Sequence, residues 1–390
     1  MVHRIQQLFA ERVHAAERPL MVRSPGRVNL IGEHTDYNKG FVLPAAIDKT
    51  IILAVAPLRD SRCHFVAADL NQEYVGHLAS LKKSPNGWPN YLLGVIDQMQ
   101  KAGYSIRGCA VVFGGNIPIG AGMSSSAALE CGFAYALNEL FGLGIDPLEL
   151  VKLSQRAENE FVGVRCGIMD QFVNIFGRDR NVLKIDCRSL EYEYVPFTRD
   201  DIEIVLCETE VRRTLASSEY NVRRQQCEAG VKLLQRAVPG VRSLRDVSLD
   251  LLREHKHAFD ATIYKRCEYV VRENARVLQA CGDLQRGDFR SFGQRMVESH
   301  EGLRDDYQVS SPELDALVEL AASVNGVLGA RMMGAGFGGC TINLVEEPRV
   351  DEFVRTVGES VLARSGHCGK VYITKIQSGT ARLIGEQIHV

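Results

Sequence analysis

The sequence lacks the features of several specialised protein classes. It contains no run of about 18 uninterrupted apolar residues, which argues against a membrane-spanning helix. None of its 11 cysteines are paired as Cys-x-x-Cys, so neither a structural zinc site nor a disulfide framework is supported. The formal net charge is only −2 and the pI is near 6.6, so the chain has no bulk attraction for nucleic acid or an anionic membrane. A small ligand therefore fits this composition better than a large charged partner.

Two further absences bear on location and organisation. The first residues form an amphipathic pattern without the continuous apolar core of a signal peptide, and the cysteines are odd in number and scattered, which favours a cytoplasm with reduced thiols. No internal repeat or low-complexity tract occurs. The 390 residues, 45% of them hydrophobic, predict about two domains, which we divide at 1–200 and 201–390.

A glycine- and serine-rich stretch, residues 115–130, is the most informative local pattern. It follows an apolar strand pattern at 109–113 and leads into a helix pattern at 127–141. Gly120 and Gly122 permit close backbone approach, and the three following serines can cap the helix and present hydroxyls. Because unpaired N–H groups and the positive end of the helix dipole face such a loop, it predicts an anion site suited to a polyphosphate. The alternative is a plain capped loop, and the lysine of a Walker loop is missing.

A second stretch gathers acidic and imidazole side chains in one loop. Glu33, His34 and Asp36 follow a strand pattern at 28–31, and such a cluster is suited to hydrogen-bonding the hydroxyls of a neutral ligand. Ordinary turn formation is the alternative for Asp36. Upstream, Pro25-Gly26 predicts a turn. The guanidinium of Arg27 is planar and positively charged, so it can stabilise the negative charge on a transferring phosphoryl group.

Two acidic residues further along the chain are candidates for metal binding and proton transfer. Glu158 has nearly the same angular position as the apolar Val151, so it can point inward and bind a cation; an exposed helical glutamate is the alternative. Asp170 can accept the proton of a substrate hydroxyl if it lies near Arg27, or it can simply cap a helix over 171–176.

The glycine pattern Gly334–Gly339 matches G-x-G-x-x-G but lies between two strand patterns, whereas a dinucleotide-binding motif must open a helix. It predicts a glycine turn between strands. The methyl group of Ala335 fits there only if the φ of that residue is negative.

Three of these stretches resemble motifs of the GHMP kinases, the family of galactokinase, homoserine kinase and mevalonate kinase. The segment Arg-Val-Asn-Leu-Ile-Gly-Glu-His-Thr-Asp-Tyr at 27–37 is similar to the galactokinase signature almost word for word. The run Pro-x-Gly-x-Gly-x-Ser-Ser-Ser-Ala at 118–127 resembles the phosphate loop, and Cys-Gly-Ile-Met-Asp-Gln at 166–171 resembles the catalytic segment. The likeness spans nearly the whole chain, in the family's order. It implies an α+β, two-domain GHMP kinase fold with mixed and antiparallel sheets flanked by helices and the active-site cleft between the domains.

The resemblance also implies roles for individual residues. Asp170 and Arg27 would act on the transferred group, and the sugar would be held by these two together with Glu33, His34, Asp36 and Tyr220. The nucleotide would be bound by Gly120, Gly122, Ser124, Ser125 and Trp88. Mg²⁺ would be held by Ser124, Ser125 and Glu158. Tyr220 and Trp88 have an ordinary alternative, as a surface aromatic and a core or lid aromatic.

The implied activity is transfer of the γ-phosphoryl group of MgATP to the anomeric hydroxyl of D-galactose, the first committed step of the Leloir pathway. The alternatives are a kinase for N-acetylgalactosamine or galacturonate, and a catalytically silent sensor of galactose and ATP, against which the intact serine run argues. Met333 and Ala335 depart from the Thr-Gly usual in galactokinases, which bears on rate or affinity. We expect a monomer or weak homo-oligomer that binds neither nucleic acid nor a membrane.

Overall fold

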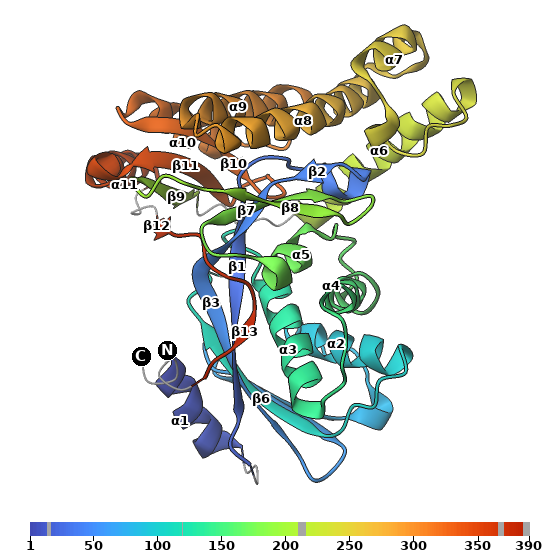
Figure 1. Ribbon diagram of the computed structural model, residues 1–390, viewed down its shortest axis with the longest axis vertical. Coiled ribbons are helices and arrows are strands. Elements are labelled where there is room, and N and C mark those ends of the chain that lie inside the picture. Colours follow the sequence, from blue (N-terminus) through green and yellow to red (C-terminus); the bar gives the residue numbers. More distant parts are fainter. Residues whose placement is uncertain (14–16, 119, 210–215, 366–369, 385–390) are drawn as a thin grey trace.

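The computed structural model describes residues 1–13, 17–118, 120–209, 216–365 and 370–384, which form an elongated α+β molecule (Figure 1). Its strands form a six-stranded sheet in the order β13-β1-β3-β6-β4-β5, a four-stranded sheet β10-β11-β9-β12 and a three-stranded sheet β2-β7-β8. The six-stranded sheet lies at one end of the molecule, between α1 on one face and α2 and α3 on the other, whereas α8, α9 and α10 cover the other end. The expected α+β class is confirmed.

The strands have the following bounds: β1 Leu20–Asn29, β2 Phe41–Val42, β3 Pro44–Pro57, β4 Arg62–Ala67, β5 Gln72–His77, β6 Cys109–Gly115, β7 Asn181–Asp186, β8 Tyr192–Pro196, β9 Ile202–Glu208, β10 Val327–Met333, β11 Cys340–Glu346, β12 Val371–Thr374 and β13 Ala381–Arg382. Periodicity predicts most of these. The predicted turn at Pro25-Gly26 is wrong, because β1 continues through it and the register against β3 shifts between Pro25 and Arg27. The strand tolerates the proline because the bulge interrupts the regular ladder there.

The helices have the following bounds: α1 Val2–Arg12, α2 Pro89–Lys101, α3 Ser125–Phe141, α4 Pro147–Arg156, α5 Met169–Phe176, α6 Ala216–Ala237, α7 Leu249–Glu254, α8 Ala261–Gln285, α9 Phe289–Glu301, α10 Pro312–Ser323 and α11 Val350–Ser365. The N-cap expected for α4 is present, since the Asp146 carboxylate accepts a hydrogen bond from the Leu148 amide at 2.8 Å. This helix continues as a π-helix over Ala157–Val162.

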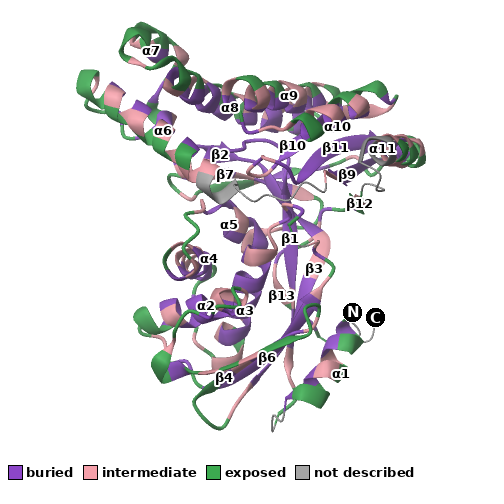
Figure 2. Ribbon diagram, turned by 180° about the vertical axis from the view of Figure 1, so that it is seen from behind, coloured by how far each residue is buried: buried purple, intermediate pink, exposed green. Residues whose placement is uncertain are grey.

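Strand β3 is buried on both faces and organises the core. Ile52 and Ala54 pack in the cluster under α1, whereas Leu53 and Val55 pack in the main core that includes α2 and α3. Buried residues accordingly dominate the central strands, while α7 is largely exposed (Figure 2). Burial on both faces explains why residues 51–56 of this strand are uniformly apolar.

The end of the described chain crosses back to the beginning. Strand β12 pairs with β9 in the four-stranded sheet, and β13 then pairs with β1 in the six-stranded sheet. A boundary at residue 200 assigns this returning segment to the second domain, although β13 pairs with a strand of the first. The boundary therefore remains a proposal.

Candidate active site

A cavity of about 590 Å³ lies where the loops of both halves of the chain meet. It is lined by residues from four stretches of sequence, namely Arg27, Gly32, Glu33, His34, Asp36, Glu158, Val162, Gly163, Val164, Arg165, Cys166, Gly167, Met169, Asp170, Tyr220, Asn221, Gly334 and Ala335. Seven of the predicted site residues are among them. These seven residues thus converge on one cavity although they lie far apart in the chain, whereas five predicted residues are not among those that line it: Gly120, Gly122, Ser124, Ser125 and Trp88.

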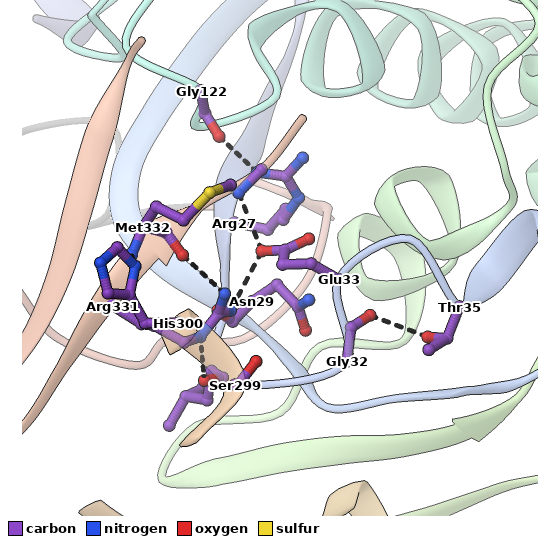
Figure 3. Close-up of polar contacts among 12 residues, drawn as sticks. Arg27, Asn29, Gly32, Glu33, Thr35, Gly122, Ser299, His300, Arg331 and Met332 are labelled. Carbon is purple, nitrogen blue, oxygen red and sulfur yellow. Dashed lines mark hydrogen bonds and ion pairs between the residues drawn. The ribbon is translucent and has the colours of Figure 1, made fainter. Parts of the chain in front are cut away.

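Arg27 and Asp170 form a bidentate ion pair at this cavity. Arg27 Nε donates to Asp170 Oδ1 at 2.7 Å, and Arg27 Nη2 donates to Oδ2 at 2.6 Å. The remaining guanidinium nitrogen, Nη1, donates to the carbonyl of Gly122 at 2.5 Å (Figure 3). Burial lowers the pKa of Arg27, but the carboxylates of Asp170, Glu33 and Asp36 together more than offset this and raise it overall. The guanidinium is therefore fixed between the acid and the glycine loop.

Asp170 does not cap helix α5. It is the second residue of that helix, whose N-cap, Ile168, makes no side-chain capping bond. The capping alternative is wrong because the carboxylate instead turns toward Arg27 and the Ser124 hydroxyl, which also donates to Oδ2. Each partner comes from a different element, so the arrangement exists only in the folded chain.

The glycine loop adopts the backbone that its composition predicts. Gly120 and Gly122 have φ values of +84° and +82°, where residues with a side chain are strained, and a Cβ on Gly120 would meet only open space. Ser124 also lies in the left-handed region and makes no capping bond to α3, so the expectation that this serine caps the helix is wrong. The loop leads directly into the 17-residue helix α3, whose N-terminus favours an anion.

Glu158 points inward as predicted, from the π-helix that follows α4. It is only 7% exposed, and its Oε2 accepts a hydrogen bond from Gln171 Nε2 at 2.7 Å. A second acid, Glu130, is fully buried beside it, and Glu130 Oε1 has no hydrogen-bond partner among the described residues. Burial raises the pKa of both carboxyl groups, each of which also faces the other acids of the site.

These residues fit a hydrated divalent cation. The buried carboxyl groups of Glu158 and Glu130 form a set of hard oxygen donors together with the Ser126 hydroxyl, which bonds Glu158. No group of three or more His, Cys, Asp or Glu suited to a metal was found in the described part of the chain, and Mg²⁺ usually needs only one or two carboxylates besides phosphates and water. The structure brings Ser126 to Glu158 and Ser124 to Asp170, so the metal roles of Ser124 and Ser125 remain predictions.

The acidic loop presents its carboxylates to the same cavity. Burial raises the pKa of Asp36 to about 7; the Tyr37 amide opposes this, and the Asp170 and Glu33 carboxylates add to it. Gly167 packs directly against Asp36, since a Cβ there would lie 1.7 Å from Asp36 Oδ2. The missing side chain of Gly167 therefore permits this close approach.

His34 is held neutral inside an aromatic cluster. Burial lowers its pKa to about 3, and Nδ1 lies 2.8 Å from the Tyr37 hydroxyl, which in turn lies 2.7 Å from the hydroxyl of Tyr307. The Tyr220 ring, 5.5 Å from the imidazole, completes the wall of the cavity. Tyr220 is thus not the ordinary surface aromatic of the alternative prediction.

The glycine pattern Gly334–Gly339 is a turn between β10 and β11, as the sequence predicts. Ala335 is not among the non-glycine residues with positive φ, so its methyl group is accommodated.

Trp88 lies away from the cavity, with its ring 5.6 Å from Phe113 and its Nε1 donating to Gln72. A role for Trp88 beside the nucleotide base remains a prediction.

Sequence reasoning missed several residues that build the site. Glu130, Ser126 and Gln171 surround Glu158, and Arg331 bonds Glu33. Glu130 and Gln171 lie inside the recognised motifs and could have been singled out as polar residues in apolar helices. Arg331 gives no such signal, because its partners are about 300 residues away.

A cavity lined by an Arg–Asp pair and a carboxylate cluster, with a glycine loop that opens a helix bonded to that pair, defines a GHMP-type small-molecule kinase. The GHMP kinase N-terminal domain matches residues 90–178, and the C-terminal domain matches 280–362. The structure of the Methanococcus jannaschii mevalonate kinase shares the fold, with a TM-score of 0.65 at 18% identity over 92% of this chain and 99% of that one.

Relatives with higher sequence identity show to which family of GHMP kinases the chain belongs. The galactokinase galactose-binding signature matches residues 7–57. The galactokinase of Roseiflexus sp. (strain RS-1) is 44% identical over 98% of this chain and 96% of its own length, and that of Thermotoga maritima is 42% identical over 89% and 95%. The crystal structure of Lactococcus lactis galactokinase complexed with galactose superposes with a TM-score of 0.94 at 36% identity, covering 98% of this chain and all of that one. The chain belongs to the galactokinase family, and it is an ATP-dependent sugar kinase.

Proposed function

We propose that this protein transfers the γ-phosphoryl group of MgATP to the C1 hydroxyl of D-galactose, giving galactose 1-phosphate and ADP. The observation that carries the proposal is the Arg27–Asp170 pair, which lines one cavity together with Glu33, His34 and Asp36. Phosphoryl transfer depends on positioning and charge stabilisation, and this cavity supplies both hydroxyl-binding groups and a guanidinium.

In the proposed reaction the C1 oxygen attacks the γ-phosphorus, the bond from that phosphorus to the bridging oxygen of ADP breaks, and the proton of the C1 hydroxyl passes to Asp170. Oδ1 of Asp170 has a single described donor, Arg27 Nε, and so retains a lone pair for the incoming hydroxyl. Arg27 stabilises the charge on the transferring group.

The nucleotide phosphates would lie on the loop at Gly120, Gly122, Ser124 and Ser125, at the N-terminus of α3. Glu158 and a loop serine would hold Mg²⁺, which, when bound, neutralises charge on the phosphates. Tyr220 and the Glu33–His34–Asp36 loop would hold the sugar, and Trp88 would contact the base.

A sugar panel tests the substrate assignment. ADP release is measured with galactose, N-acetylgalactosamine, galacturonate and glucose, each with MgATP. We expect turnover with galactose and at least tenfold lower kcat/KM with the other sugars. If galactose is not phosphorylated while another sugar is, the substrate assignment is wrong; no turnover with any of them would favour a silent sensor.

We also propose a cytoplasmic location. The ten cysteines within the described ranges are all free, as in a reducing compartment. Among the described residues no helix combines the length and apolar content of a bilayer-spanning segment. Fractionation of the native cells would test the location.

A further inference from the structure

Arg331, on β10, is a fully buried charge beside the loop that carries Glu33, His34 and Asp36. We call this segment the sugar loop, after its role in the proposed function. Its side chain is 0% exposed, and all three guanidinium nitrogens donate to fixed acceptors. Nε donates to the Leu30 carbonyl at 2.7 Å and Nη1 to the Met332 carbonyl at 2.6 Å. Nη2 is shared between the Asn29 carbonyl and Glu33 Oε1. A single side chain thus connects β10 to the end of β1 and to the loop that follows it (Figure 3).

The Glu33 carboxylate is oriented by the same neighbourhood. Glu33 is 3% exposed, and its Oε1 accepts from Arg331 Nη2 at 3.0 Å and from the Gly334 amide at 2.8 Å. Both hydrogen bonds from described residues to this carboxylate end on Oε1, so Oε2 is the oxygen left for another donor. Glu33 and Gly334 both line the cavity.

Stability alone does not account for a buried arginine. Removing a guanidinium from water is costly, and replacing a buried ion pair by apolar residues of similar volume is often neutral or stabilising. The fork of Arg331 does, however, fix the position of a carboxylate at a cavity wall, which a hydrophobic side chain cannot do.

We propose that Arg331 is a positioning residue for sugar recognition, which holds Glu33 so that Oε2 accepts one hydroxyl of the bound sugar while Oε1 stays engaged. This rests on the proposed function, in which Glu33 contacts the sugar. It also makes Glu33 an acceptor for one sugar hydroxyl through one oxygen, although a free carboxylate can accept two such bonds.

The test is Arg331→Lys, which keeps the charge but loses the fork. We expect the KM for galactose and its Kd by calorimetry to rise at least tenfold, while the KM for ATP changes less than twofold and kcat less than threefold. A merely structural role would lower the folded fraction, and with it kcat and Tm, without changing either KM. Galactose affinity within twofold of the wild type would overturn the proposal.

Two further variants make the test specific. Arg266→Lys is the matched control, because Arg266 is only 3% exposed but donates to Asp306 and Gln308, outside the sugar loop. We expect it to leave galactose affinity within twofold. Glu33→Gln should weaken galactose binding, and adding Arg331→Lys to it should weaken binding less than twofold more, because the arginine acts through Glu33. If the two losses multiply, Arg331 acts by another route and the proposal fails.

The outcome also separates this inference from the substrate assignment. All binding is measured with the sugar that the wild type binds best in the panel. If that sugar is not galactose, only the substrate assignment fails. Equal affinity in wild type and Arg331→Lys overturns only the positioning role, and a wild type that binds no sugar overturns both.

Discussion

At the scale of single residues, the cavity holds three of its ionisable side chains, His34, Arg27 and Asp36, in different protonation states. His34 is kept neutral by burial, whereas Arg27 keeps its charge because Asp170 pairs with it. Burial raises the pKa of Asp36 to about 7, so this carboxyl group loses its proton only near neutral pH. Each of these states follows from burial and from the charge of the neighbours.

Asp170→Asn should reduce kcat by about 10²–10⁴-fold, the usual contribution of a positioned proton acceptor. The amide still accepts a hydrogen bond from Arg27, so we expect the Kd for galactose to change by less than about threefold, within the usual context-dependence of one neutral hydrogen bond. Steady-state kinetics and calorimetry measure the two quantities.

The control for that variant is Asp179→Asn, an exposed aspartate shortly after the same helix, which should leave both quantities unchanged. Full activity in Asp170→Asn would remove this residue from the mechanism.

Asp36 should make the protein less stable as pH rises from about 4 to 7. Its folded-state pKa of about 7 exceeds its ordinary value of 3.8, so over this range the folded chain binds a proton that the unfolded chain has released. Asp36→Asn removes this penalty, and it should unfold at higher urea than the wild type at pH 8, with the gain shrinking toward pH 4.5.

The same group should affect sugar affinity. If the carboxylate form accepts the sugar hydroxyls, kcat/KM for galactose falls as pH drops below about 7 in the wild type but not in Asp36→Asn. Parallel pH profiles for the two proteins, or an equal stability gain at both pH values, would contradict the role of Asp36.

At the scale of elements, the site depends on backbone positions that only glycine can occupy. The turn between β10 and β11 passes so close to residue 309 that a Cβ on Gly336 would lie 2.1 Å from the Val309 carbonyl oxygen. Gly336 also has a φ of +84°. Gly334, two residues earlier, donates its amide to Glu33, so a displaced turn would disturb the sugar loop.

Gly336→Ala should therefore lower the free energy of unfolding by at least ~1–3 kcal/mol, the usual cost of a residue forced into a sparsely populated conformation. Urea unfolding measures it. Gly358→Ala is the matched control, because Gly358 lies in helix α11 with no atom within 4 Å of an added Cβ. That variant should be more stable by ~0.5–1 kcal/mol. Equal effects of the two changes would mean that the turn tolerates a side chain.

Much of this element structure could be predicted from the sequence. The apolar run of β3, the helix after the glycine loop and the Asp146 cap are all set by residues close together in the chain. The π-helix at Ala157–Val162, the bulge in β1 and the parallel pairing of β4 with β6 could not, because tertiary contacts decide them. The candidate site was predictable where it coincides with motifs. Arg331 and Tyr307 were not, since only folding brings them to the sugar loop.

At the scale of the whole molecule, the segment from β12 to β13 ties the two ends of the described chain together. The Thr380 amide donates to the Asn174 carbonyl at 2.7 Å, and the Thr380 hydroxyl lies 3.0 Å from the Ser24 hydroxyl and 2.6 Å from Asn174 Oδ1. Asn174 is one turn after Asp170 on α5. The returning segment therefore supports the helix that carries the proposed proton acceptor.

Thr380→Val should lower the free energy of unfolding by ~1–3 kcal/mol, because it removes hydrogen bonds to two buried polar side chains. It should also reduce kcat modestly, by less than about fivefold, or ~1 kcal/mol in activation free energy. Ser323→Ala, which removes an exposed hydroxyl bond at the end of α10, is the control and should change stability by no more than ~0.5 kcal/mol. An unchanged unfolding midpoint for Thr380→Val would show that this segment does not support α5.

The pairing of β13 with β1 has a consequence for synthesis of the protein. Strand β1 leaves the ribosome more than 350 residues before its neighbour does, since Val22 pairs with Arg382. Until residues 381 and 382 have left the ribosome, that edge of the sheet stays open, available to chaperones or to another nascent chain. Completion of the six-stranded sheet therefore waits for these residues, and nascent chains stalled before them should bind no sugar.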